Sequence, residues 1–174
     1  MKASAPPPTS SSDSVTSKNL DAYLNDHLAG SVAALELIDH WREQQKEKPL
    51  EGFFASLYAE VRADQTVLCD VMRFLGIEES TLRQSGAWAA EKVARARLKI
   101  AGDEAGLVLA LEGLTMGITG KRMLWRSLAV AELPNTSEWS FEQLQRRADD
   151  QIQRIEAERM KAAQRAFAYA SGQD

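Results

Sequence analysis

Residues 51–76, EGFFASLYAEVRADQTVLCDVMRFLG, carry the clearest folding pattern in the chain. Their apolar side chains recur every three or four residues, which is the period of one helix face; they are Phe54, Leu57, Val61, Leu68, Val71, Met72 and Leu75. Gly76 follows the last of them, and glycine commonly ends a helix. The stretch therefore predicts an amphipathic helix, whose apolar face is interrupted by one carboxylate, Asp64.

Similar patterns lie on both sides of this stretch. They predict helices from Ser17 or Asn19 to about Gln45, from Ser80 or Thr81 to Gly102, from Asp103 to about Leu133, and from Ser140 onward. Pro49 fits the first turn of the helix that contains Asp64, and Ser140 with Gln143 forms a plausible capping box. Because the connections are short, successive helices should be antiparallel neighbours. We expect an all-α protein, an antiparallel four-helix bundle with a long C-terminal fifth helix.

The overall composition is that of one globular domain. Residues 1–17 are rich in proline and serine and predict a disordered tail, which leaves residues 18–174 as a single helical-bundle domain. A net charge of -4 without a basic stripe argues against nucleic-acid binding. With no membrane-length apolar run and no secretory signal, we expect a cytoplasmic protein. The single cysteine, Cys69, is interpreted as a small buried hydrophobe.

Two polar residues stand where a helix bundle needs apolar ones, His27 and Asp64. A buried carboxylate must be paired, protonated or bound to a metal ion. When the chain is folded at each loop, Asp64 comes level with Glu91 and Glu112, and His27 lies roughly 7 Å along the axis. Three interpretations follow: a metal-free network of His27, Asp64 and Lys121; a site for iron or another divalent metal; or ordinary surface charges. The metal site would use His27, Asp64, Glu91 and Glu112, with Glu60 in reserve.

Three motifs carry a resemblance to a known superfamily: YLNDHLAGSV at 23–32, WAAEK at 88–92 and GKRMLW at 120–125. Over residues 19–130 the chain resembles the ferritin-like superfamily, in particular a group of small uncharacterised bacterial helical-bundle proteins. The resemblance implies a bundle with an inward layer of carboxylates and histidine, which holds two metal ions in active members. Those members carry Glu-x-x-His on two helices, and this chain has no such motif. We therefore expect a buried polar network, with no cofactor and no enzymatic activity, rather than a working di-iron centre.

The helix predicted from Asp103 carries apolar residues on two sides. Its second side holds Val108, Leu109, Met116 and Met123, and its glycines at 113, 117 and 120 allow either a close helix crossing or the approach of a ligand. A helix that is apolar on both sides needs cover on both sides. The sequence predicts a homodimer, with this second side and the fifth helix near the interface. The alternative is that the fifth helix covers the second side within one chain. A self-associating structural or interaction module is accordingly a second functional hypothesis.

Overall fold

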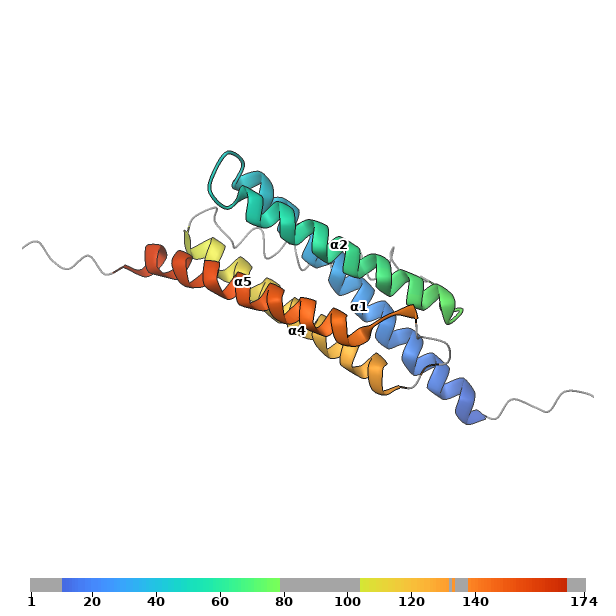
Figure 1. Cartoon of the computed structure of the whole chain (residues 1–174). Helices are drawn as coiled ribbons and strands as arrows, with labels where there is room; N and C mark the ends of the chain where they lie inside the picture. Colours follow the sequence, from blue (N-terminus) through green and yellow to red (C-terminus); the bar gives the residue numbers. More distant parts are fainter. Residues whose placement is uncertain (1–10, 79–103, 132, 134–137, 169–174) are drawn as a thin grey trace, which may run out of the picture.

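The computed structural model describes residues 11–78, 104–131, 133 and 138–168, and for residues 11–17 it describes the backbone alone (Figure 1). All four elements in these ranges are helices: α1 (Ser11–Gln44), α2 (Glu51–Phe74), α4 (Glu104–Val130) and α5 (Phe141–Phe167). This confirms an all-α protein over the described residues. The helix predicted from Ser80 to Gly102 lies outside them, as do Glu91 and most of the predicted tail. The helix α1 begins at Ser11, upstream of the predicted cap residues.

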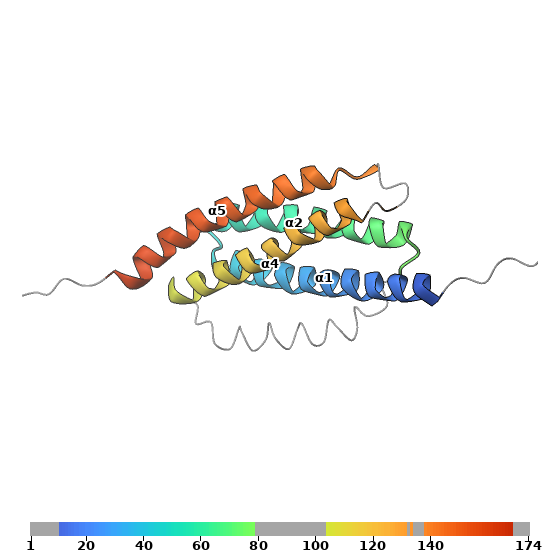
Figure 2. The same ribbon diagram turned by 90° about the horizontal axis from the view of Figure 1, so that it is seen from below.

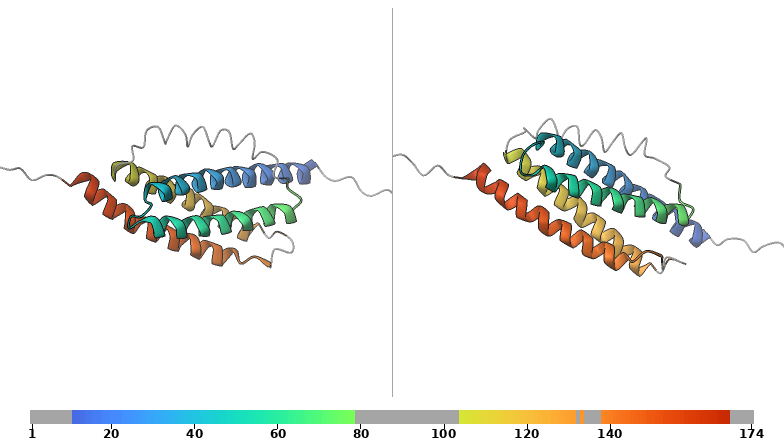
Figure 3. Two further views of the ribbon diagram at one scale, coloured as in Figure 1. Left: turned by 90° about the horizontal axis from the view of Figure 1, so that it is seen from above. Right: turned by 45° about the horizontal axis from the view of Figure 1, so that its top comes forward.

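The four helices form two tightly packed pairs, α1 with α2 and α4 with α5, and α1 also contacts α4. Their long axes run in the same general direction, and α4 lies between α1 and α5 (Figures 2 and 3). Trp41 of α1 stacks on Phe54 of α2 with ring centroids 6.5 Å apart, so the end of one helix meets the start of the next. Trp125 of α4 stacks on Phe141 of α5 in the same way, at 6.2 Å.

The core consists of two clusters of buried side chains, one towards each end of the described helices. The first joins the end of α1, the first half of α2, the first half of α4 and α5 from Ala148 onward; it includes Leu35, Ile38, Trp41, Phe54, Leu57, Val61, Leu107, Val108, Leu111, Leu114, Ile118, Ala148, Ile155 and Ala162. The second joins Leu24, Leu28, Leu68, Val71, Met72, Ile77, Leu124, Trp125, Leu128, Phe141 and Leu144. Burial of these faces removes apolar surface from water, which is the main source of stability in such a bundle.

The predicted helix ends agree with local capping chemistry at two places. Gly76 has a φ of 68°, its N–H donates to the carbonyl of Arg73, and the N–H of Ile77 donates to the carbonyl of Met72. These two bonds form the Schellman motif that ends α2. Ser140 is the N-cap of α5, where its side chain accepts a hydrogen bond from the Gln143 N–H. Pro49 does not lie in the first turn of α2 as predicted, because the N-cap of this helix is Leu50 and the helix begins at Glu51.

The second apolar side predicted for the helix from Asp103 is covered only in part among the described residues. Val108 is only 3% exposed, because it packs in the first core cluster with residues of α5. Leu109, Met116 and Met123 remain exposed. The helix α5 therefore covers part of the second apolar side of α4 within the same chain, and leaves another part open.

Candidate functional site

Asp64 is the centre of a polar network between three helices. It lies on the buried face of α2 and is 2% exposed. Its Oδ2 accepts a hydrogen bond from the Lys121 ammonium of α4, and its Oδ1 accepts one from the Arg147 guanidinium of α5. The carboxylate is therefore paired with two cations from two different helices, as a buried charge requires.

Gln151 of α5 extends this network. Its side chain is fully buried; Oε1 accepts a hydrogen bond from Lys121 Nζ at 2.6 Å, and Nε2 donates to Glu60 Oε2 at 3.1 Å. Nε2 also lies 3.4 Å from Asp64 Oδ2. Glu60 in turn accepts hydrogen bonds from Arg154 and from Ser56. We call Asp64, Glu60, Lys121, Arg147, Gln151 and Arg154 the Asp64 network; it joins α2 to α4 and α5.

The charges in the Asp64 network are shaped by burial and by one another. Burial lowers the pKa of Lys121 below its ordinary value, although the attraction of Asp64 opposes this effect. Burial alone would raise the pKa of Glu60, but hydrogen bonds from Arg154, Gln151 and Ser56 outweigh it and lower that pKa. The hydrogen bonds of the network thus favour the charged form of Glu60, whereas burial disfavours the charged form of Lys121.

His27 lies near the Asp64 network without a hydrogen bond to it among the described residues. The imidazole is half-buried and meets the Tyr23 ring edge-on, with centroids 4.7 Å apart. Burial lowers the pKa of His27, and the nearby Asp26 carboxylate opposes this only in part. The predicted network of His27, Asp64 and Lys121 is therefore present as an Asp64–Lys121 pair, with His27 to one side.

The residues predicted to bind a metal ion do not converge in the part of the chain that the structure describes. Glu112 is exposed and pairs with Arg159 at 3.5 Å, while Glu60 is held by Arg154. Both oxygens of Asp64 already accept hydrogen bonds from cations. No group of three or more His, Cys, Asp or Glu side chains that could hold a metal ion occurs among the described residues. Glu112 lies on the outer, exposed side of α4 and is not part of the Asp64 network.

The partners that sequence reasoning missed are Arg147 and Gln151. A signal for Gln151 was present, because it interrupts the apolar positions of α5 as Asp64 interrupts those of α2. The buried residues of α5 are Phe141, Leu144, Ala148, Gln151, Ile155 and Ala162. A lone buried amide among them must find hydrogen-bond partners. Arg147 carries no comparable signal, since it is one of many charged residues on this helix.

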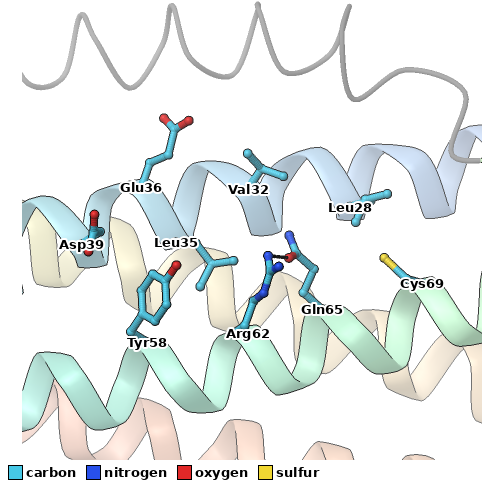
Figure 4. Close-up of a pocket in the computed structure, with 9 residues that line it drawn as sticks. All are labelled: Leu28, Val32, Leu35, Glu36, Asp39, Tyr58, Arg62, Gln65 and Cys69. Atoms are coloured by element: carbon cyan, nitrogen blue, oxygen red, sulfur yellow. Dashed lines mark hydrogen bonds between the residues drawn. The ribbon is translucent and has the colours of Figure 1, made fainter.

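Two open grooves flank the helices. One, of about 410 Å³, lies between α1 and α2; Figure 4 shows Arg62 hydrogen-bonded to Gln65 on its α2 side, with Glu36 and Asp39 on the α1 side. Half-buried Cys69 lies at one end of this groove, rather than in the core as predicted. The second groove, of about 630 Å³, lies along Glu60, Arg147 and Arg154 between α2 and α5. A third, more enclosed cavity of about 240 Å³ borders Asp64, Lys121 and His27.

The chain matches no family model, and neither the curated proteins nor the solved structures contain a match to it. Among the described helices, none combines the length and apolar character needed to cross a membrane. Function must therefore be argued from the side chains themselves.

Proposed function

We propose that the protein is a self-associating helical-bundle module of the ferritin-like type, in which the Asp64 network is a structural clamp rather than a metal centre. In this proposal the bundle is antiparallel and the chain forms a homodimer through α4. The observation that carries it is a row of four exposed apolar side chains on α4, called here the α4 row. They are Leu109, Met116, Met123 and Val130, exposed by 55%, 71%, 55% and 79%.

The spacing of the α4 row favours a helix as its partner. Its members recur every seven residues, and side chains at that spacing follow one narrow seam along a helix. Large apolar residues scattered singly on a surface need no explanation, but a continuous seam of them is typical of an interaction surface. Two of the four are methionines, which adapt readily to an apposed surface.

The charges beside the α4 row favour a second copy of the same chain. Glu112 and Arg126 are both exposed, and they lie equally far on either side of Thr119. A twofold axis through Thr119 would place each Glu112 opposite the Arg126 of the other copy. The midpoint of Met116 and Met123, and of Leu109 and Val130, lies half a residue further along, so the same axis brings each of these pairs together with an offset of one residue, about 1.5 Å along the helix. A twofold interface requires this self-complementarity, because the same surface is used on both copies.

Light scattering of the full-length chain during size-exclusion chromatography tests the proposal. We expect twice the mass of one chain at micromolar concentration. Met116→Glu with Met123→Glu should give the mass of one chain, because four carboxylates would then be buried in the seam. Met160→Glu is the matched control: Met160 is 48% exposed but lies on α5, outside the α4 row, so this variant should remain a dimer.

A charge exchange tests the twofold geometry. Glu112→Arg or Arg126→Glu alone should weaken the dimer, and the two together should restore it. A wild-type chain that stays at the mass of one copy would reject the dimer. If the methionine variants then lowered only the melting temperature, the α4 row would be covered by another part of the same chain.

A further inference from the structure

A partly enclosed cavity lies between α1, α2 and α4. It has a volume of about 240 Å³ and lies beside Asp64 and Lys121. Most of its surface is apolar, with Leu68, Ile118 and Leu124 in its wall. For comparison, a dry cavity of about 150 Å³ lined by apolar side chains holds benzene. The space therefore suits a molecule with a single ring and a small substituent.

Glycines keep this space open. Gly30 of α1 and Gly117 of α4 border the cavity, and a Cβ atom at either position would meet no other atom within 4 Å. Gly120 borders it as well, and its Cβ would lie 4.0 Å from His27 Cε1, which is ordinary contact. A side chain could therefore begin at any of these positions without a clash, so close helix packing does not require glycine there. Gly30 and Gly117 are both exposed, so they lie on the open side of the cavity. Glycine in a helix interior lowers helix stability relative to alanine, and no close helix contact accounts for that loss at these two positions.

The charges around the cavity favour an uncharged occupant. Lys121 is already paired with Asp64, and Asp64 is paired with Arg147 as well. An anion would meet the carboxylates of Asp64 and Asp26, whereas a cation would meet Lys121. Ser31 and Gln65 also line the cavity, but they are hydrogen-bonded to each other. His27 has no hydrogen bond among the described residues, and burial lowers its pKa and so favours the neutral imidazole, which can both donate and accept one hydrogen bond.

We propose that this cavity binds an uncharged single-ring molecule of phenol type, with its ring against Leu68, Ile118 and Leu124 and its hydroxyl group hydrogen-bonded to the imidazole of His27. The apolar wall supplies most of the affinity, and the single hydrogen bond orients the molecule, as in most small-molecule sites.

Titration of the full-length protein with p-cresol and with toluene tests the site. The two probes have similar shapes, but only p-cresol carries a hydroxyl group. Binding is followed by the methyl NMR signals of Ile118 and Leu124 in protein labelled with ¹³C. We expect saturable shifts with both probes and binding of p-cresol about tenfold tighter than that of toluene. His27→Leu should remove the preference for p-cresol and leave toluene binding.

A filling variant provides the second test. Gly117→Leu places a side chain at the cavity and should abolish the shifts with both probes. Gly52→Leu is the matched control, because a Cβ at Gly52 also meets nothing within 4 Å but this residue lies in the first turn of α2, away from the cavity. Gly117→Ala serves as a milder variant, expected to weaken both probes while the helix content stays that of the wild type. Absence of saturable shifts in the wild type, or unchanged binding in Gly117→Leu, would overturn the proposal.

Discussion

Asp64 connects three helices through one side chain. It is held by a lysine from α4 and an arginine from α5, and it is almost fully buried. Lys121 is 14% exposed, whereas Arg147 is 38% exposed and can reach water if its partner is lost. Loss of the Asp64 carboxylate should therefore destabilise the fold more through Lys121 than through Arg147.

Replacement of Asp64 by alanine should lower the free energy of unfolding by about 3–5 kcal/mol, because the buried Lys121 charge would lose its carboxylate counter-ion and keep only the uncharged Gln151 as a partner. The double variant Asp64→Leu, Lys121→Met removes both charges and should unfold near the wild-type midpoint or above it. Urea denaturation measures both effects. Glu142→Ala, which breaks an exposed ion pair with Arg146, is the control and should cost less than about 1 kcal/mol. Equal midpoints for wild type and Asp64→Ala would contradict the clamp.

His27 should make stability depend on pH. Since burial lowers its pKa in the folded protein, the unfolded chain takes up the proton first as the pH falls below about 6.5. The free energy of unfolding should therefore decrease from about pH 6.5 down to the folded pKa, and this contribution should be constant below it. His27→Gln should reduce the slope in that range, as measured by urea denaturation at a series of pH values. His40→Gln removes the other histidine and is the control; an identical slope in wild type and His27→Gln would exclude this role.

Two glycines of the helices, Gly76 and Gly117, have different structural roles. Gly76 ends α2 in a left-handed conformation that a residue with a Cβ adopts at a cost, whereas Gly117 lies inside α4 with open space where a side chain would begin. The first is required by backbone geometry. Glycine at 117 is required neither by the backbone conformation nor by packing.

Alanine at these two positions should have opposite effects. Gly76→Ala should destabilise the protein by about 1–2 kcal/mol because of its φ of 68°. Gly117→Ala should stabilise it by roughly 0.5–1 kcal/mol through better helix propensity without a clash. Thermal denaturation followed by circular dichroism measures both shifts. A loss of stability in Gly117→Ala would show that the space beside it is filled by another part of the chain.

For the whole molecule, α5 is an integral part of the described bundle rather than an appendage. It contributes Ala148, Ile155 and Ala162 to the first core cluster, and Arg147 and Gln151 to the Asp64 network. The helix therefore closes the bundle on the side where α2 and α4 would otherwise expose their polar interior. The α4 row remains outside this closure, which is why the proposed dimer interface is on α4 and not on α5.

Local features of the sequence were sufficient to predict the helices that the structure describes. The apolar period, the cap at Ser140 and the glycine at 76 depend only on residues a few positions apart, so they can be recognised without the fold. The interruption at Asp64 also predicted a buried charge with Lys121 as a partner, because an ion of this kind cannot be left unpaired.

The groups that complete the site come together only when the helices pack. The rotation and height of α5 against α2 depend on packing between helices distant in the sequence, and these bring Arg147 and Gln151 to Asp64. The same packing buries Val108, exposes Glu112 and leaves His27 at the edge of a cavity. A helical period determines which residues share a face, but the choice of neighbour for that face is made by the shape and volume of all the helices together.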